Sequence, residues 1–417
     1  MSAAAGSEFF DTLETRDPAE REREQLARLP RQIAHAKAHA PALARLLAGV
    51  DPAAVTSRDA LAAVPVTRKS ALLELQQAER PFGGLAATRW GAIRRVFASP
   101  GPICEPEGAA PDYWRFARAL FAAGFRPGDL IHNCFSYHFT PAGSMLETGA
   151  HALGCTVFPG GVGQTEQQVQ AMVDLSPDGY VGTPSFLKII LEKADEQGIG
   201  LPSLKKALLS AEAFPPSLRD AFAARGILGY QTYASADLGA IAYETPARDG
   251  LVVDEGVLLE IVTPGTGDPV AQGDVGEVVV TTLHTVDYPL IRFGTGDLSA
   301  ILPGPSPCGR TNARIKGWLG RADQRTKVKG MFVDPAQVAA IVRRHPEIAR
   351  ARLVVDNPGD ADRMTLHVET AAPAPALRDA IAASIRDVTK LRGEVAFQAA
   401  GELANDGKVI DDRRVYR

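Results

Sequence analysis

Cysteine is scarce in this sequence of 417 residues, which contains only Cys104, Cys134, Cys155 and Cys308. No two of them form a CxxC pair, which argues against a disulfide framework and against a cysteine-rich metal site. Long apolar runs are also missing, since none approaches the roughly 18–20 residues that a membrane-spanning helix needs. There is no excess of basic residues either: the formal net charge is −4, so nothing favours nucleic acid or an anionic membrane as a partner. The acidic N-terminal stretch lacks a secretory signal pattern, and we therefore expect a cytoplasmic protein.

Hydrophobic residues, by contrast, are abundant: they make up 45% of the chain, which is enough for a large buried core. At roughly 100–200 residues per domain, the length predicts two or three domains. Apolar positions recur at helical spacing in residues 8–48 and more weakly in 57–77, which predicts a helical N-terminal cap over residues 1–80. We place a large domain at residues 1–321 and a small one at 322–417.

Strand and helix patterns alternate from about residue 90. "AIRRVFAS" has the character of a strand that enters a Pro/Gly loop, and "YWRFARALFAAGF" predicts an amphipathic helix. The strand–helix plan occurs again in "DGYVGTPSFLKIILEKADEQG" and in "LKKALLSAEAFPPSLRDAFAARG". Such alternation is typical of parallel βαβ units and predicts an α/β large domain.

Strands of another kind follow. "GVLLEIVTP" and "GEVVVTTLH" predict an antiparallel pair, which would form a β subdomain. The last 95 or so residues alternate helix, strand, strand and helix, which predicts a small α+β domain.

The most specific motif is "YPLIRFGTGDLS", from Tyr288 to Ser299. It closely resembles an element of the adenylate-forming enzymes of the phenylacetate–CoA ligase type, which join a carboxylic acid to AMP and pass the acyl group to coenzyme A. The resemblance implies that Asp297 accepts hydrogen bonds from both ribose hydroxyls of the nucleotide.

Further elements follow the order of the same family. "WLGRADQRTKVKGMFVDPAQV" is similar to its hinge segment. The resemblance implies that Arg321 meets the ribose or phosphate and that Asp323 is the hinge between the two domains. It also implies that Lys329 and Gly330 lie on the loop that forms the coenzyme A tunnel.

Two upstream segments resemble the family's adenine and metal elements. In "GYQTYASADLGAIAYE", Tyr233 would stack on or flank the adenine, and Asp237 stands where the family has a glutamate that ligates Mg²⁺. A hard cation accepts either carboxylate. "LLSAEAFPP" would place Ala211 and Glu212 beside the adenine.

The C-terminal "ELANDGKVIDDRR" is similar to the family's catalytic lysine segment, although it is two residues shorter. The resemblance implies that Lys408 stabilises charge during adenylation. Together these elements imply ATP or AMP, Mg²⁺ and coenzyme A as ligands, and relatives suggest a homodimer.

The chain departs from the family at its phosphate loop, which here is "SPGPICEP", from Ser99 to Pro106. Such a loop holds phosphates by backbone N–H groups, which prolines cannot supply. The family's lysine is replaced by Glu105, and exchanging +1 for −1 about 4 Å from a phosphate changes the interaction by several kcal/mol. Ser99 and Gly101 would still belong to the loop.

Three hypotheses account for this departure. Glu105 ligates Mg²⁺; or the loop lies away from the nucleotide, and Lys408 and Arg321 hold the phosphates; or the protein no longer adenylates and binds acyl-adenylate or acyl-CoA on the same fold. A carrier protein or an amine as the acyl acceptor is a further alternative to coenzyme A. We expect no zinc site, because Cys308 is the one soft ligand left where some relatives carry cysteines.

The segment "NCFSYHFTPAGS" matches the family's acyl pocket. Tyr137, His138 and Phe139 would form an aromatic wall, which suits a small aromatic acid. A core aromatic cluster with a hydrogen-bonded His138 is the alternative.

Overall fold

The computed structural model describes residues 8–99, 103–322, 324, 326–328, 331–358 and 362–414. The chain forms two compact units. Unit 1 comprises Met1–Leu259, Val280–Phe293 and Leu302–Gly317; unit 2 comprises Glu260–Val279, Gly294–Ile301 and Trp318–Arg417. The division expected after residue 321 stays a prediction.

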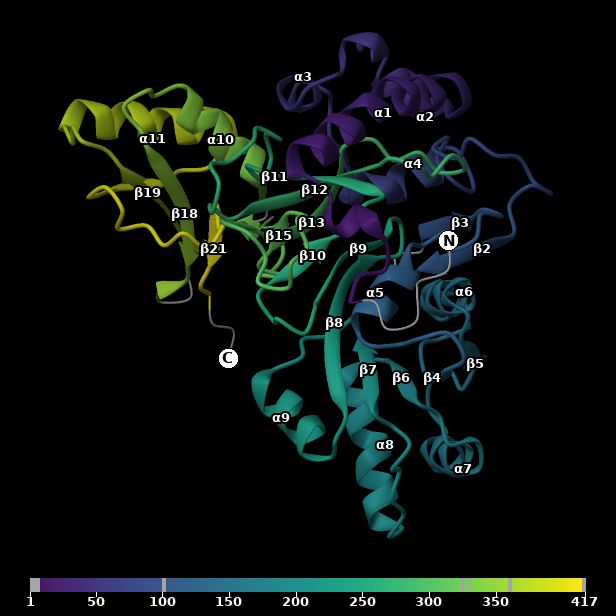
Figure 1. The fold of residues 1–417 in the computed structure, drawn as a ribbon. Coiled ribbons are helices and arrows are strands. Elements are labelled where there is room, and N and C mark those ends of the chain that lie inside the picture. The colour runs from purple at the N-terminus through teal and green to yellow at the C-terminus, as the bar shows by residue number, and fades with distance from the viewer. Residues whose placement is uncertain are drawn as a thin grey trace. The chain divides into compact units, whose positions relative to one another are not determined.

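Helices dominate the N-terminal part of unit 1, as the apolar spacing predicted (Figure 1). They are η1 (Thr12–Thr15), α1 (Pro18–His39), α2 (Pro41–Leu46), η2 (Pro52–Ala54), α3 (Arg58–Ala62), η3 (Lys69–Ala71) and α4 (Leu72–Ala78), with the short strand β1 (Thr67–Arg68) before η3. Asp17 caps α1 by accepting from the Glu20 backbone at 3.0 Å, which satisfies an N–H that the first turn leaves free. None of the helices in the described ranges is long and apolar enough to cross a bilayer.

A nine-stranded sheet forms the centre of the fold. Its order is β14 (Ile301–Leu302), β15 (Arg314–Ile315), β10 (Leu251–Val253), β9 (Gly239–Tyr243), β8 (Leu228–Ser235), β7 (Lys206–Leu209), β6 (Gly179–Gly182), β4 (Leu130–Asn133) and β5 (Thr156–Phe158). The run from β8 to β5 is parallel, which confirms the predicted βαβ units. The helices α6 (Ala142–Leu153), α7 (Thr165–Leu175), α8 (Pro184–Glu196) and α9 (Pro216–Ala224) alternate with these strands (Figure 1).

The inner parallel strands β6 and β7 are largely buried, as expected for strands that are covered on both faces. In β7, Leu208 packs into a core with residues of α5 (Phe116–Ala122) and α6. Its neighbours Ala207 and Leu209 point into a second core with residues of α7 and α8. The period-two alternation of a strand thus divides one apolar run between two layers.

Helix α5 begins later than its sequence predicted. The apolar pattern starts at Tyr113, but Arg115 adopts a left-handed conformation with φ of 63°, and the helix starts at Phe116. The Asp112 carboxylate accepts from the Phe116 backbone N–H at 2.8 Å. This side chain satisfies the first turn and fixes the start of the helix.

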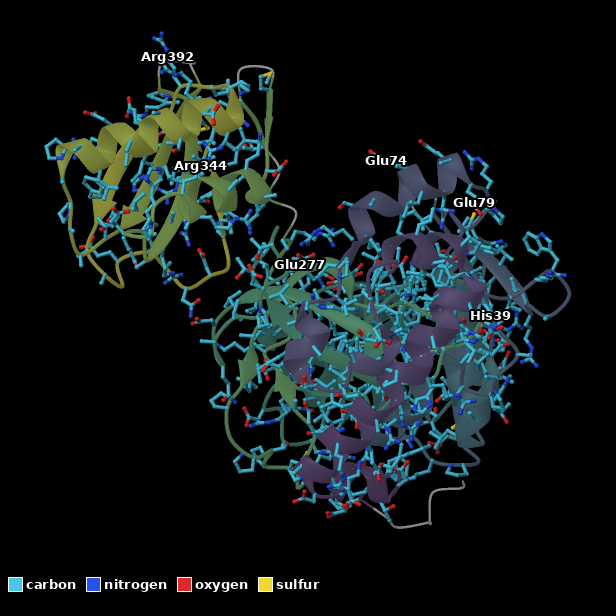
Figure 2. All side chains as sticks on the ribbon, turned by 90° about the horizontal axis from the view of Figure 1, so that it is seen from above. His39, Glu74, Glu79, Glu277, Arg344 and Arg392 are labelled. Carbon is cyan, nitrogen blue, oxygen red and sulfur yellow. The ribbon has the colours of Figure 1, made fainter. Side chains whose placement is uncertain are left out.

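Smaller sheets complete the described part of the chain. A four-stranded sheet has the order β1, β13 (Phe293–Ser299), β12 (Gly276–Thr282) and β11 (Val257–Val262), so the two predicted strands β11 and β12 are hydrogen-bonded neighbours. The C-terminal part of unit 2 contains β16 (Thr326–Val328), β17 (Met331–Val333), α10 (Pro335–Arg343), β18 (Arg350–Asp356), β19 (Arg363–Glu369), α11 (Pro375–Thr389), β20 (Glu394–Gln398) and β21 (Ile410–Asp412). The sheet order β20-β19-β18-β21 and the two helices confirm an α+β fold for this part. Arg344 and Arg392, labelled in Figure 2, lie exposed on it.

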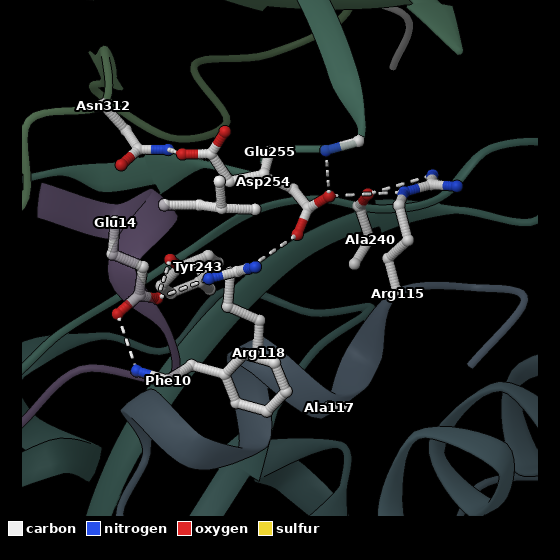
Figure 3. Close-up of polar contacts among 12 residues, drawn as sticks. Phe10, Glu14, Arg115, Ala117, Arg118, Ala240, Tyr243, Asp254, Glu255 and Asn312 are labelled. Carbon is white, nitrogen blue, oxygen red and sulfur yellow. Dashed lines mark hydrogen bonds and ion pairs between the residues drawn. The ribbon is translucent and has the colours of Figure 1, made fainter. Parts of the chain in front are cut away.

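A network of buried charges joins the N-terminal segment to the central sheet (Figure 3). Glu14, which has no exposed surface, accepts hydrogen bonds from the Tyr243 hydroxyl at 2.8 Å and from the Phe10 backbone at 3.0 Å. The same carboxylate pairs with Arg118 at 3.3 Å and with Arg310 at 3.0 Å. A buried charge without a partner is costly, so each member of the network depends on the others.

Replacing Glu14 should therefore destabilise unit 1. We expect Glu14→Ala to lower the free energy of unfolding by about 3–5 kcal/mol, because two buried guanidinium groups lose a carboxylate. Glu192 is the control, since its pair with Lys188 at 3.5 Å is exposed on both sides, and Glu192→Ala should cost less than about 1 kcal/mol. Urea unfolding measures both values, and equal losses for the two variants would contradict the prediction.

Candidate active site

The carboxyl ends of β7 and β8 bring together residues that the sequence assigned to the adenine. The two strands are parallel, with Leu209 opposite Gln231, and the Ser210 hydroxyl donates to the Thr232 carbonyl at 2.9 Å. Ala211 follows β7 with φ of 69°. Ligands of open α/β sheets bind at this edge, where loops rather than regular pairing present the side chains.

The neighbouring adenine candidates differ in their exposure. Tyr233 is buried in β8, where a register shift lies between Tyr233 and Ala234. Glu212 is exposed, and its carboxylate accepts from the Ser185 backbone N–H at 3.3 Å, at the start of α8. A carboxylate suits the positive end of a helix, so this contact also has a structural role.

Asp237 lies in the turn between β8 and β9, and its side chain has no exposed surface. The turn is held close to the strand–helix connection around Trp114: Gly239 has φ of 75°, and a Cβ there would lie 2.6 Å from the Trp114 carbonyl oxygen. The Lys69 ammonium donates to Oδ2 of Asp237 at 2.7 Å. Lys69 comes from η3, and no sequence signal pointed to it.

The other oxygen of Asp237 fits a cation. Oδ1 is buried and has no hydrogen-bond partner among the residues that the structure describes. An unpartnered carboxylate oxygen is a suitable ligand for Mg²⁺, although Lys69 already holds the second oxygen. In the same described ranges, no three His, Cys, Asp or Glu side chains are grouped so as to hold a metal ion.

The expected phosphate loop is mostly a β-hairpin, which corrects the sequence analysis. Strand β2 (Arg95–Ser99) pairs antiparallel with β3 (Ile103–Glu107), and Ser99 stands opposite Ile103. Glu105 is therefore a strand residue, and it is fully buried. Its carboxylate accepts from the Ser99 backbone N–H at 3.2 Å and also from the Ser99 hydroxyl. The third loop candidate, Gly101, lies outside the described residues.

Burial determines the protonation of Glu105. It raises the pKa of this carboxyl to about 7, and the negative charge of Asp237 adds to the rise. Hydrogen bonds from Ser99 and the positive charge of Lys69 act in the opposite direction. Asp237, Lys69 and Glu105 thus interact electrostatically within unit 1.

A second cluster, in unit 2, contains the expected ribose residue. Asp297 in β13 is half-buried, and its Oδ1 accepts from Arg321 at 2.9 Å and from the Trp318 indole at 3.0 Å. Asp297 and Arg321 also form an isolated β-bridge. The structure therefore joins two residues that separate motifs had assigned to the nucleotide. Trp318, whose side chain is 57% exposed, was missed, although it stands two residues before the "GRAD" motif.

The expected catalytic lysine lies on the surface of unit 2. Lys408 is half-exposed, and its ammonium donates to Asp411 at 3.1 Å. Burial by itself raises the pKa of the Asp411 carboxyl. Hydrogen bonds from Arg413 and Lys408 outweigh this effect and hold the pKa below its ordinary value. Three further expected residues of this unit, Asp323, Lys329 and Gly330, lie outside the described residues.

The three residues expected to form the aromatic wall differ in their exposure to solvent. Tyr137 is half-buried, and its hydroxyl accepts from the Asn133 amide at 2.8 Å. His138 is exposed, and Phe139 is 80% exposed with φ of 61°. The Phe139 carbonyl accepts from the Ala98 N–H at 2.8 Å, which fixes this loop beside β2.

Comparison with known proteins decides the family. A sequence profile for AMP-binding enzymes matches residues 112–286. The phenylacetate-coenzyme A ligase of Thermus thermophilus is 34% identical over 366 residues, covering 84% of this chain and 81% of that protein. The chain belongs to the phenylacetate–CoA ligase family of adenylate-forming enzymes. The family member from Aromatoleum evansii is 33% identical, over 83% of this chain and 80% of that protein.

A solved structure agrees with this membership. The crystal structure of 2-hydroxyisobutyryl-CoA ligase in complex with 2-HIB-AMP and CoA is 27% identical, with a TM-score of 0.71. The match covers 99% of this chain and 94% of that one. The family resemblance of the motifs and the α/β fold with an α+β C-terminal part are thereby confirmed.

The buried Glu105 generates a prediction for stability. Its folded pKa of about 7 exceeds its ordinary value of 4.5, so the stability that it contributes is fully present below pH 4.5 and is lost as pH rises through 7. Relative to Glu105→Gln, the wild type should lose up to about 3 kcal/mol of unfolding free energy between pH 4.5 and pH 8. Urea unfolding at several pH values measures this difference.

The control variant is Glu166→Gln, since Glu166 is exposed on α7. Its unfolding free energy should follow that of the wild type at each pH. A constant difference between wild type and Glu105→Gln across this range would show that the buried carboxyl does not change its protonation on unfolding.

Proposed function

We propose that the protein is an ATP-dependent, AMP-forming acyl-CoA ligase that activates a small carboxylic acid through an acyl-adenylate. The observation that carries this proposal is the contact between Asp297 and Arg321, 2.9 Å apart. Two motifs that the family assigns to the nucleotide meet there in a chain that is 34% identical to a phenylacetate-coenzyme A ligase.

The roles of the residues follow from their chemistry. Asp297 offers carboxylate oxygens to the ribose hydroxyls, and charge-assisted hydrogen bonds of this kind are stronger than neutral ones. Arg321 adds positive charge beside them. Ala211, Glu212 and Tyr233 are assigned to the adenine, where an aromatic face can stack on the base.

Other residues are assigned roles in balancing phosphate charge and in domain closure. Asp237 would hold Mg²⁺, which when bound neutralises phosphate charge. Lys408 is assigned to the charge that develops during adenylation. Asp323 is the proposed hinge, and Lys329 and Gly330 the proposed coenzyme A loop, because closure about a few residues can separate two half-reactions.

The proposed acid is small and aromatic. Tyr137, His138 and Phe139 supply aromatic surface, and Phe139 is held in a left-handed conformation with its ring exposed. Residues with a strained backbone conformation of this kind gather at functional sites. The aryl side chain of an acid would cover the ring of Phe139.

Calorimetric titration with Mg·ATP and, separately, with AMP tests the function without knowledge of the acid. The ligase proposal expects both to bind, and ATP to require the metal. A second assay follows coenzyme A-dependent AMP release with arylacetic, benzoic and short hydroxy acids. Failure of both nucleotides to bind would overturn the proposal.

The buried Glu105 favours one alternative. A carboxylate in place of the loop lysine disfavours a triphosphate, and in this alternative the protein binds acyl-adenylate or acyl-CoA without ATP. Binding of AMP without binding of Mg·ATP would support this alternative.

The ribose assignment predicts the effect of removing Asp297. Asp297→Ala should weaken AMP binding at least about 30-fold, or about 2 kcal/mol, because charge-assisted acceptors are lost. Asp356 is the matched control, since it also lies on a strand of unit 2 and pairs with an arginine, Arg363, at 2.7 Å. Asp356→Ala should bind AMP like the wild type, and equal affinities for all three proteins would disprove the assignment.

A further inference from the structure

The side chain of Gln324 binds the main chain on both sides of Lys408. Before the lysine, the Gln324 amide nitrogen donates to the Gly407 carbonyl at 2.9 Å. After it, the amide oxygen accepts from the Ile410 N–H at 2.7 Å and also from the Val409 N–H. A glutamine amide supplies the donor and the acceptor that this geometry needs, whereas an ionised glutamate supplies acceptors alone.

The backbone groups of Lys408 itself are also bonded to side chains. Its N–H donates to the Asp406 carboxylate at 3.1 Å, and its carbonyl accepts from the Arg352 guanidinium at 3.1 Å. Arg352 is buried and donates to the Ala404 carbonyl at 2.8 Å as well. Residues 404–409, which we call the lysine loop, are therefore fixed through their main chain, while the Lys408 side chain stays half-exposed.

Gln324 belongs to a short segment that also contacts the expected ribose residue. Three residues earlier, Arg321 pairs with Asp297 at 2.9 Å. Between the two, the Ala322 N–H donates to the Gly296 carbonyl at 2.6 Å, beside Asp297 in β13. Residues 321–324 thus touch both the ribose cluster and the lysine loop, and they include the proposed hinge.

The lysine loop also lies close to β12 and β13. Gly407 has φ of 71°, and a Cβ there would lie 2.6 Å from Cγ1 of Val275 and 3.1 Å from Cδ1 of Leu298. Leu298 directly follows Asp297 in sequence. A side chain at position 407 would therefore push the loop away from the strand that carries the ribose residue.

We propose that Gln324 is a positioning residue for Lys408, because it joins the lysine loop to the segment that follows the proposed hinge, Asp323. This inference rests on the proposed function, in which Lys408 stabilises the charge that develops during adenylation. Rotation about the hinge then carries the lysine loop with it as one piece. A charge that is oriented in advance acts without reorganisation at the moment of reaction, so Gln324 affects the rate of adenylation more than the binding of the nucleotide.

Pyrophosphate release in the absence of coenzyme A tests the positioning. The assay uses Mg·ATP and whichever arylacetic, benzoic or short hydroxy acid the wild type converts fastest. We expect Gln324→Ala to lower kcat at least about tenfold and to change the KM for Mg·ATP less than about twofold. Gln398→Ala is the matched control and should change neither, because Gln398 is a half-buried glutamine of the same unit that bonds His367 at 3.0 Å.

A double variant distinguishes positioning from a general structural role. If Gln324 acts through Lys408, the two substitutions are not additive, and adding Gln324→Ala to Lys408→Ala should lower the rate less than about twofold further. Where Gln324→Ala does not fold, Gln324→Glu replaces it in each measurement, since it keeps the accepting oxygens and loses the donor to Gly407. Effects that multiply in the double variant, or a wild-type kcat without the Gln324 amide, would overturn the proposal.

Hydrogen exchange of the nucleotide-free protein separates this inference from the proposed function. The amides of Val409 and Ile410 should exchange several-fold faster in Gln324→Ala than in the wild type, and at the wild-type rate in Gln398→Ala. Unchanged exchange in Gln324→Ala would refute the contact with the lysine loop whatever the protein does. Faster exchange in a protein that binds neither Mg·ATP nor AMP would refute the ligase, and with it the role of Lys408, and keep the contact.

Discussion

The ion pair between Lys69 and Asp237 is the interaction on which the unit 1 site depends. Asp237 is buried in a tight turn that Gly239 holds against the Trp114 carbonyl. A buried carboxylate without a charged partner is costly, and Lys69 supplies that partner from η3, in the N-terminal helical part. The N-terminal helical part therefore contributes a buried ion pair as well as packing, and this pair holds the turn after β8 electrostatically.

Glu105 makes the β2–β3 hairpin unlike a phosphate-binding loop. A loop that holds phosphate presents its N–H groups to the ligand, whereas here the Ser99 N–H and hydroxyl are both given to Glu105. The carboxylate thus acts as an internal substitute for an anion and joins β2 to β3. Because burial raises its pKa to about 7, the charge of this group changes with small changes in pH.

Local sequence patterns predicted what depends on local physics. The βαβ alternation and the C-terminal α+β part follow from the periodicity of apolar residues. The motifs also predicted that Asp297 and Arg321 share a site. Lys69 could not be predicted, because its partner Asp237 lies 168 residues away and a lysine in a helical segment is most often solvated. The prediction of a loop from Ser99 to Pro106 was wrong in part. Its prolines argued against a strand, but β3 pairs with β2, and the Glu105 carboxylate is hydrogen-bonded to Ser99 inside this hairpin.

The two clusters make different demands on a nucleotide. Ribose is neutral, so in the proposed ligase its recognition by Asp297 and Arg321 would depend on hydrogen-bond geometry rather than on net charge. Phosphates are charged, and each one added increases the repulsion from Asp237 and Glu105. In the proposed ligase, AMP can therefore be held by its nucleoside, whereas ATP must bring a divalent cation. In that proposal, the glutamate at position 105 would leave the neutralisation of phosphate charge to a bound cation rather than to the hairpin.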